Sequence, residues 1–252
     1  MQLSHAQKKQ LFGAGYVKLP GVVPQAMVNG ALRAINHSVG NGMNVEDMTR
    51  FRAQTYCPEL RGTPVISGLF NDTPARSLAE SAIGAGKLRP VTGGQIALRF
   101  PTNQDPPSKP GPHIDGMYSA TNGVAEGTIQ NFTALVGVLL SDLPEEGAGN
   151  FTVWPGTHHL LESHFREHTP QSLLAGMPKI DFPPPTPITG KAGDIVLCHY
   201  QLCHGIMPNV SPHVRYAIFF RLSHVDHEQH KWDSMTDIWL EWEGMQEFAA
   251  DR

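Results

Sequence analysis

The hydrophobic pattern changes its period near residue 94, and this change limits the folds that the chain can adopt. Before it, apolar residues recur with helical spacing, as in residues 24–39 and 72–84. After it, short alternating or continuous apolar stretches are separated by glycine and proline, which is typical of strands and turns. We therefore predict a mainly β protein, with N-terminal helices flanking a sandwich or barrel of several short strands. The predicted strands include residues 94–100, 132–140, 150–154, 195–200 and 214–222.

The chain of 252 residues could form one large domain or two small ones. No linker-like change of composition divides it, so we predict a single domain with three parts. These parts are a helical flank over residues 1–90, a strand core over residues 91–223, and a helical tail over residues 234–248.

Charge and composition argue against several classes of function. The net charge is −4 and no basic run is present, so binding to nucleic acid is not indicated. The longest apolar run, residues 134–140, is too short to cross a bilayer, and the N-terminus lacks the pattern of a signal peptide. Three cysteines without scaffold spacing favour a reducing compartment. We expect a cytoplasmic protein that binds neither membranes nor nucleic acid.

Two possible metal ligands, His113 and Asp115, stand two residues apart. On an extended strand their side chains would point to the same side. One imidazole and one carboxylate are two of the three ligands of a 2-His-1-carboxylate site, which holds a divalent metal on one side and leaves the other side open for ligands. The pair alone also occurs in surface loops, so a third ligand is needed. We predict His204 in that role, with His199 as its competitor.

Several stretches resemble the phytanoyl-CoA dioxygenase family of Fe(II)/2-oxoglutarate oxygenases. The first is His-Ile-Asp at residues 113–115, and the second is Gly-Asn-Phe-Thr-Val-Trp-Pro-Gly-Thr-His at residues 149–158. The third begins with Gly-Asp-Ile-Val at residues 193–196 and extends through His204-Gly205 and Pro208-Asn209 to Arg215. The opening at residues 15–20 is also similar, whereas residues 40–90 and the tail after residue 224 match poorly.

The resemblance implies a double-stranded β-helix, which is a cupin-like jelly roll, with Fe(II) at its mouth. His113, Asp115 and His204 would be the metal ligands, and the remaining positions would serve 2-oxoglutarate as cosubstrate and O2. No catalytic residue beyond these ligands is predicted. Because relatives that halogenate have a small residue in place of the carboxylate, Asp115 predicts hydroxylation or a related oxidation.

Arg215 is the predicted partner of the distal carboxylate of 2-oxoglutarate, because a planar guanidinium can pair with both oxygens. The sequence departs from the family nearby. A small hydroxyl residue that often stands two positions after the distal histidine is replaced by Ile206. We therefore expect Gln95 and Arg99, on one face of the strand at residues 94–100, to help hold the cosubstrate. An exposed strand face is the alternative for both.

The sequence thus predicts an Fe(II)/2-oxoglutarate-dependent dioxygenase that hydroxylates an unactivated carbon of a small organic substrate, with release of succinate and CO2. Met117, Tyr118 and Trp154 are predicted to line the path of the substrate. No cluster of Lys and Arg would suit the phosphates of coenzyme A, so a CoA thioester is not expected.

Two other functions remain open at this level. A jelly-roll metalloenzyme could use the same ligands without 2-oxoglutarate, and a binding protein could keep the fold without catalysis. A monomer and a homodimer are both compatible with the sequence. The Trp239 and Trp242 stripe of the tail would serve either packing within the chain or a dimer contact.

Overall fold

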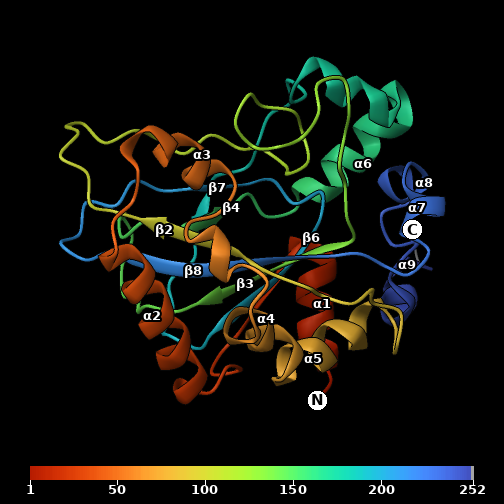
Figure 1. Ribbon diagram of the computed structural model, residues 1–252. Helices are drawn as coiled ribbons and strands as arrows, with labels where there is room; N and C mark the ends of the chain where they lie inside the picture. The colour runs from red at the N-terminus through yellow and green to blue at the C-terminus, as the bar shows by residue number, and fades with distance from the viewer. Residues whose placement is uncertain (251–252) are drawn as a thin grey trace.

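The larger of two antiparallel sheets takes its strands from both halves of the chain. A computed structural model describes residues 1–250, and its five-stranded sheet has the order β1-β6-β3-β8-β2. These strands are β1 (Tyr16–Leu19), β6 (Ile195–His199), β3 (Ala134–Leu139), β8 (Arg215–Leu222) and β2 (Gln95–Arg99). The N-terminal flank therefore contributes an edge strand, β1, in addition to helices (Figure 1).

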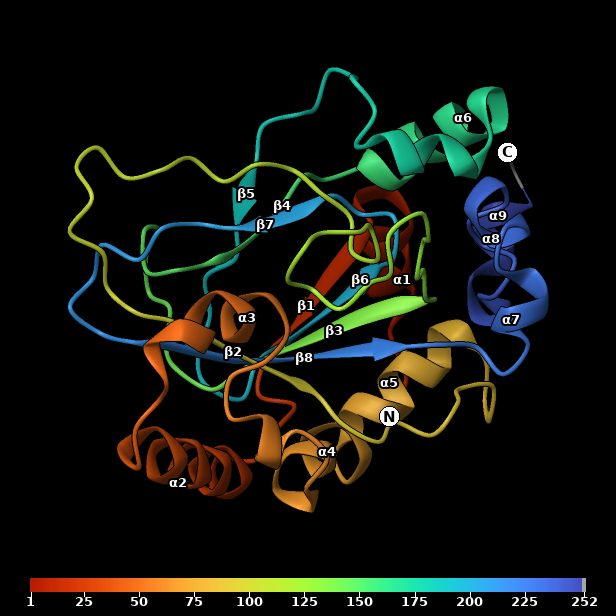
Figure 2. The same ribbon diagram turned by 45° about the horizontal axis from the view of Figure 1, so that its top comes forward.

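A smaller sheet lies over one face of the larger one (Figure 2). It has the order β5-β4-β7, with β5 (Thr186–Pro187), β4 (Phe151–Val153) and β7 (His204–Ile206). The sheets meet through side chains such as Phe151 and Phe219, whose ring centroids are 5.2 Å apart. Two antiparallel sheets packed face to face fit the predicted jelly roll.

Helices nevertheless contain more residues than strands, so the expectation of a mainly β chain is not confirmed. The α-helices are α1 (His5–Ala14), α2 (Gln25–Gly40), α3 (Met48–Ala53), α4 (Pro64–Asn71), α5 (Pro74–Ile83), α6 (Thr157–His168), α7 (His227–His230), α8 (Asp233–Thr236) and α9 (Gln246–Ala249). Short 3-10 helices span Val45–Asp47, Pro58–Leu60, Pro170–Ala175 and Glu243–Met245.

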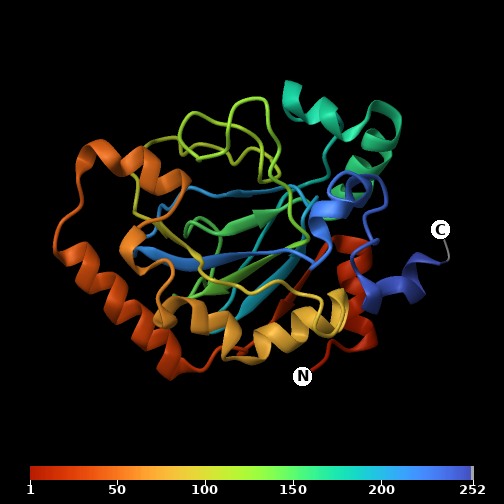
Figure 3. The ribbon, with the colours of Figure 1, turned by 45° about the vertical axis from the view of Figure 1, so that its right-hand side comes forward.

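Strand β3 is buried along its whole length because both faces of the larger sheet are covered. One face packs on α2, α4 and α5, which run beneath the sheet in Figure 3. There the ring centroids of Phe70 in α4 and Phe220 in β8 are 5.6 Å apart. The other face joins the core shared with the smaller sheet, where Leu135 lies. Burial on both sides explains why residues 134–140 form a continuous apolar run instead of alternating.

Local capping signals in the sequence mark the first residues of two helices correctly. The pattern Ser-His-Ala-Gln at residues 4–7 predicts a capping box, and Ser4 forms it at the start of α1. Thr73 caps α5 ahead of a proline in its first turn. By contrast, the weakly patterned residues 40–70 contain both α3 and α4. In α6, Leu160 is 43% exposed although the pattern places it inside.

The C-terminal segment is not the single helix predicted over residues 234–248. It consists of α8, a 3-10 turn at Glu243–Met245, and α9. The apolar side chains that a helical pattern places on one side are all buried: Met235, Ile238, Trp239, Trp242 and Met245. Trp239 stacks on Phe12 of α1, with ring centroids 5.2 Å apart. Because Trp239 and Trp242 are 0% and 1% exposed, they pack within the chain and present no surface to a second copy.

An ion pair between His227 and Glu241 ties this segment to the sheets. Nδ1 of His227 lies 2.9 and 3.0 Å from the two carboxylate oxygens of Glu241, and Nε2 lies 3.1 Å from the carbonyl oxygen of Asn131. Each ring nitrogen of His227 therefore lies within hydrogen-bond distance of an acceptor oxygen. Burial opposes ionisation of Glu241, but His227 and the hydroxyl of Thr133 outweigh it and lower its pKa.

We expect Glu241→Gln to lower the free energy of unfolding by about 3 kcal/mol, because it removes one partner of the buried His227–Glu241 pair. Since the folded state lowers the pKa of Glu241, its contribution is fully present above the pKa of the unfolded chain, about 4.3. It is lost as the pH falls below that value. Urea unfolding between pH 3 and 7 measures both effects.

Glu228→Gln is the matched control, since Glu228 forms only a surface pair with Arg89 at 3.3 Å. This control should change stability by less than about 1 kcal/mol. Equal effects of the two substitutions would show that the buried pair does not stabilise the C-terminal segment. Within residues 1–250, no helix combines the length and the apolar character that crossing a membrane requires.

Candidate active site

His113 and His204 are brought together by a short piece of antiparallel pairing. The backbone N–H of His113 donates to the carbonyl of His204 at 3.0 Å, and that of His204 donates back at 2.8 Å. The two imidazole centroids are therefore only 4.7 Å apart. The prediction of a strand through Asp115 is wrong, because only His113 pairs and Asp115 lies in a turn. The turn, and not strand alternation, directs the carboxylate toward the imidazoles.

Gly116 allows this turn. Its φ is +87°, and its carbonyl accepts a hydrogen bond of 2.9 Å from the N–H of Gln130. A Cβ at this position would lie 2.1 Å from the carbonyl oxygen of Gln130. On the other side, the hydroxyl of Tyr200 donates to the backbone carbonyl of Asp115 at 3.1 Å. The backbone on both sides of the carboxylate is thus held by the protein core.

We expect Gly116→Ala to weaken metal binding at least about tenfold, because the clash shifts Asp115 away from the histidines. Gly127→Ala is a close control, since Gly127 also has a positive φ, +72°, but open space around its Cβ position. The control should show only backbone strain of about 1 kcal/mol and unchanged metal affinity. Metal titration and urea unfolding of both variants test this, and equal metal affinities would contradict the role given to Gly116.

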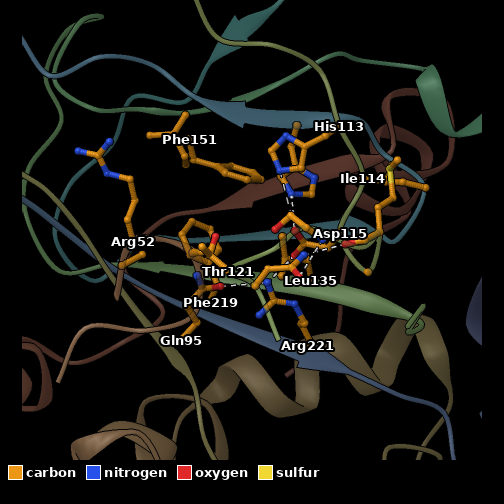
Figure 4. A pocket seen from close by; sticks show the side chains of 18 of the residues that line it. Arg52, Gln95, His113, Ile114, Asp115, Thr121, Leu135, Phe151, Phe219 and Arg221 are labelled. Carbon is orange, nitrogen blue, oxygen red and sulfur yellow. Dashed lines mark hydrogen bonds and ion pairs between the residues drawn. The ribbon is translucent and has the colours of Figure 1, made fainter. Parts of the chain in front are cut away.

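The ligand atoms of the three residues converge. Oδ1 of Asp115 lies 3.9 Å from Nε2 of His113 and 3.5 Å from Nε2 of His204. All three ligand atoms lie within 4.8 Å of one another. Adjacent ligands on a first-row metal are about 3 Å apart at bond lengths near 2.1 Å, so small side-chain movements would complete the site. Figure 4 shows Asp115 between His113 and Arg221 in the pocket.

The hydrogen bonds of the histidines leave the nitrogens that a metal needs. Nδ1 of His204 lies 3.0 Å from the carbonyl of Leu202 and so carries the proton, which leaves the lone pair of Nε2 facing Asp115. The His113 side chain is 48% exposed, but its ring lies against the cavity wall. Burial of the ring against this wall removes water from it. This desolvation and the neighbouring His204 lower the pKa of His113 to about 4. At neutral pH, His113 is therefore in the neutral form that binds metals.

Arg221 holds the other oxygen of the carboxylate. Its Nη2 lies 2.6 Å from Oδ2 of Asp115 and 3.0 Å from the side-chain oxygen of Gln95. Burial opposes ionisation of Asp115, but the guanidinium of Arg221 is the main opposing cause, and the pKa of Asp115 lies well below the usual range. Oδ1 thus faces the histidines while Oδ2 is anchored. This donor set of two neutral imidazoles and one oriented carboxylate fits Fe(II).

Arg215 is a buried cation without an acidic partner among residues 1–250. It is 2% exposed, and its Nε and Nη1 donate to the carbonyls of Gly149 and Ala97 at 2.9 and 3.0 Å. Its Nη2 is buried and has no hydrogen-bond partner in the part of the chain described. Burial, and secondarily Arg99, lower the pKa of Arg215 to about 9. The free Nη2 and the missing counter-charge fit an incoming carboxylate.

One cavity of about 550 Å³ contains His113, Asp115, His204 and Arg215. This volume lies within the usual range for small-molecule sites. The predicted residues Gln95, Arg99, Met117 and Tyr118 also line it, as does Ile206. Trp154 does not: it is 4% exposed and packs in the core between the sheets, with its ring beside Gly205. The expected role of Trp154 in the substrate path is therefore corrected to a packing role.

Two arginines of the cavity, Arg52 and Arg221, were missed in the sequence. Arg221 stands six residues after Arg215 on β8, so strand alternation places both on the same face of the sheet. That even spacing was a usable signal. Arg52 lies on α3, in a segment without clear pattern, and Figure 4 shows it across the pocket from His113.

In a second group of possible metal ligands, His224, His230 and Glu241, the first and the last already have other contacts. Nδ1 of His224 accepts a hydrogen bond of 3.1 Å from the N–H of Asp226, so its other nitrogen carries the proton. The oxygens of Glu241 accept hydrogen bonds from His227 and Thr133. We interpret this group as an ion-pair cluster of the C-terminal segment.

The chain is similar to known proteins in sequence and in structure. The sequence model of the phytanoyl-CoA dioxygenase (PhyH) family matches residues 13–217. A comparison with curated proteins found no match. Among solved structures, the chain is similar to SnoK, a non-heme α-ketoglutarate-dependent carbocyclase from nogalamycin biosynthesis. The identity is 18% and the TM-score 0.57, over 91% of this chain and 90% of that chain.

The chain is also similar to HygX from Streptomyces hygroscopicus, whose structure contains nickel and 2-oxoglutarate. Here the identity is 19% and the TM-score 0.58, over 88% of each chain. At such low identities, the structural likeness shows a common fold. The family match rests on the sequence itself and covers most of the chain.

Proposed function

Because this chain belongs to the phytanoyl-CoA dioxygenase family, we propose that it hydroxylates an unactivated carbon of a small organic molecule. Its class is that of the Fe(II)- and 2-oxoglutarate-dependent oxygenases. The observation that carries the proposal is the meeting, in one cavity, of a metal-ligand triad and a buried arginine without counter-charge.

In this proposal, His113, Asp115 and His204 hold the metal, and Arg215 binds the distal carboxylate of 2-oxoglutarate. When bound, Fe(II) and 2-oxoglutarate supply the oxidising power for O2 activation, with succinate and CO2 as co-products. The protein's own part is to position these groups and to exclude water. Arg221 keeps Oδ2 of Asp115 turned away from the histidines, so that Oδ1 remains available to the metal.

The apolar side chains of the cavity support a dry reaction site. Leu135, Phe151, Phe219 and Ile206 line the same cavity as the histidines and Arg215. Ile206 supplies no hydroxyl to the cosubstrate, so Arg215 carries most of that binding, with Arg99 as a neighbouring cation. Met117 and Tyr118 line the cavity from the loop after Asp115, and we propose that the substrate passes beside them.

The absence of a basic run in the sequence does not exclude a CoA thioester as substrate. No basic run is present, yet folding gathers Arg52, Arg99, Arg215 and Arg221 in one cavity. We retain a free small molecule as the proposed substrate and include acyl-CoA thioesters as the contrasting class in the test. A reducing compartment also remains a proposal, supported by three buried cysteines that form no disulfide.

The proposal is tested by loading the purified protein with Fe(II) and measuring succinate formed from 2-oxoglutarate, with and without candidate substrates. We expect slow succinate release without substrate and faster release with a true substrate. His204→Ala should abolish it, while His213→Ala, at an exposed histidine outside the cavity, should not. A folded, metal-loaded protein that neither binds nor consumes 2-oxoglutarate would refute the proposal and leave a metalloenzyme of another kind or a binding protein.

A further inference from the structure

A second cavity, of about 440 Å³, adjoins the metal pocket at the N-terminal end of β2. Its lining includes Arg61, residues 90–93, and three residues shared with the metal pocket, Gln95, Phe219 and Arg221. Gln95 and Phe219 are register partners, and Arg221 follows Phe219 by two residues on β8. All three side chains therefore project from the same face of the sheet. The two cavities lie side by side on this face, with these side chains between them.

The lining of both cavities has a strong excess of positive charge. The second cavity is lined by Arg61 and Arg221 and contains no acidic residue, and the metal pocket contains four arginines and one carboxylate, Asp115. Fe(II) and the 2-oxoglutarate dianion carry equal and opposite charges, so binding both leaves the excess unchanged. A pocket of this kind attracts a further anion and disfavours a cationic substrate.

The two arginines of the second cavity have donors to spare. The backbone carbonyl of Arg61 accepts a hydrogen bond of 3.1 Å from the N–H of Gly94, which fixes the base of this side chain beside β2. Arg61 is exposed and lines the cavity, and its guanidinium has no acidic or hydrogen-bonding partner within residues 1–250. Arg221 uses Nη2 for Asp115 and Gln95, while its Nε and Nη1 have no hydrogen-bond partner in that same range. A guanidinium offers five donors, so most of those of Arg221 remain available.

We propose that the substrate carries an oxyanion, either a carboxylate or a phosphate, which binds in the second cavity to Arg61 and to the free edge of Arg221. The rest of the substrate extends past Gln95 and Phe219, so that the carbon to be oxidised reaches the metal pocket. This inference rests on the proposed function, because it assigns the substrate class of the same site. Arg221 then links the two sites, since one edge of its guanidinium holds Asp115 and the other receives the substrate.

Binding of inorganic phosphate to the Ni(II)- and 2-oxoglutarate-loaded protein tests the anion site without turnover. We expect calorimetry to show saturable phosphate binding. Arg61→Ala should weaken this binding at least about tenfold, because the loss of one hydrogen bond to a charged group lowers affinity by at least about that factor. Arg61→Lys should restore part of the affinity. Arg33→Ala, at an exposed arginine of α2, is the matched control and should bind like the wild type. Equal affinity of Arg61→Ala and Arg33→Ala, or no phosphate binding to the wild type, would overturn the proposal.

Succinate release with pairs of compounds tests the substrate class. Each pair consists of a carboxylic acid or phosphate ester and its neutral methyl ester or amide. We expect stimulation by acidic members only, with the KM for a stimulating acid raised at least about tenfold in Arg61→Ala and the KM for 2-oxoglutarate unchanged. Stimulation by neutral members equal to that by acids would contradict the proposal. If no compound stimulates succinate release, the phosphate titration of the wild type and of Arg61→Ala decides whether the anion site exists.

The two arms separate this inference from the proposed function. A wild-type protein that binds phosphate through Arg61 but never consumes 2-oxoglutarate would refute the proposed function alone. A protein that consumes 2-oxoglutarate and responds to acids equally well with and without Arg61 would refute only the anion site.

Discussion

Asp115→Ala is expected to abolish 2-oxoglutarate turnover and to weaken binding of a divalent metal by more than about 100-fold. Loss of a residue that only supports a metal ligand weakens metal binding by up to about 100-fold. We expect a larger loss for Asp115 because it would itself be a ligand, with an oxygen 3.5 and 3.9 Å from the two histidine nitrogens. The fold should survive, because the arginine left without its partner, Arg221, is 40% exposed and can turn toward water. Metal content by mass spectrometry, succinate release and thermal unfolding measure these three effects.

Asp181→Ala is the control for Asp115→Ala, since Asp181 is exposed and lies outside the cavity. It should bind metal and turn over 2-oxoglutarate like the wild type. A variant lacking Asp115 that keeps wild-type metal affinity would show that the three residues do not form the metal site, even though their side chains converge.

Arg215→Met is expected to raise the KM for 2-oxoglutarate at least about 100-fold while leaving metal affinity unchanged. Truncating one partner of a buried charge pair costs about 2–5 kcal/mol in binding, and the guanidinium of Arg215 is 2% exposed. The stability of the cosubstrate-free protein should change by less than about 2 kcal/mol. Removal of an uncompensated buried charge stabilises, whereas the lost hydrogen bonds to Gly149 and Ala97 destabilise.

Arg215→Lys distinguishes charge from shape in the same experiment. Lysine keeps the charge but not the planar fork, so it should recover only part of the affinity for 2-oxoglutarate. The wild-type unfolding temperature should rise with 2-oxoglutarate in the presence of metal, and that of Arg215→Met should not. If 2-oxoglutarate stabilises both proteins equally, the distal carboxylate is bound elsewhere, and Arg99 or Arg52 becomes the next candidate.

Local patterns predicted those parts of the chain whose conformation depends on near neighbours. The capping box at Ser4 and the proline after Thr73 marked helix starts correctly, because those hydrogen bonds span only a few residues. The stripe of the C-terminal segment identified buried residues such as Trp239 and Trp242, although the segment is broken into short turns. Burial depended on the apolar pattern, while the path of the backbone depended on packing against α1 and α6 (Figure 1).

The sequence alone indicated the chemistry of the site, because imidazole, carboxylate and guanidinium groups in family-like motifs restrict the ligands that a pocket can hold. Only the tertiary structure decided their arrangement. It replaced the expected strand at Asp115 by a turn at Gly116, moved Trp154 into the core, and brought Arg221 to the free oxygen of Asp115. These outcomes depend on contacts between residues far apart in the chain. Such contacts are set by the packing of two sheets against helices, and they leave little trace in local spacing.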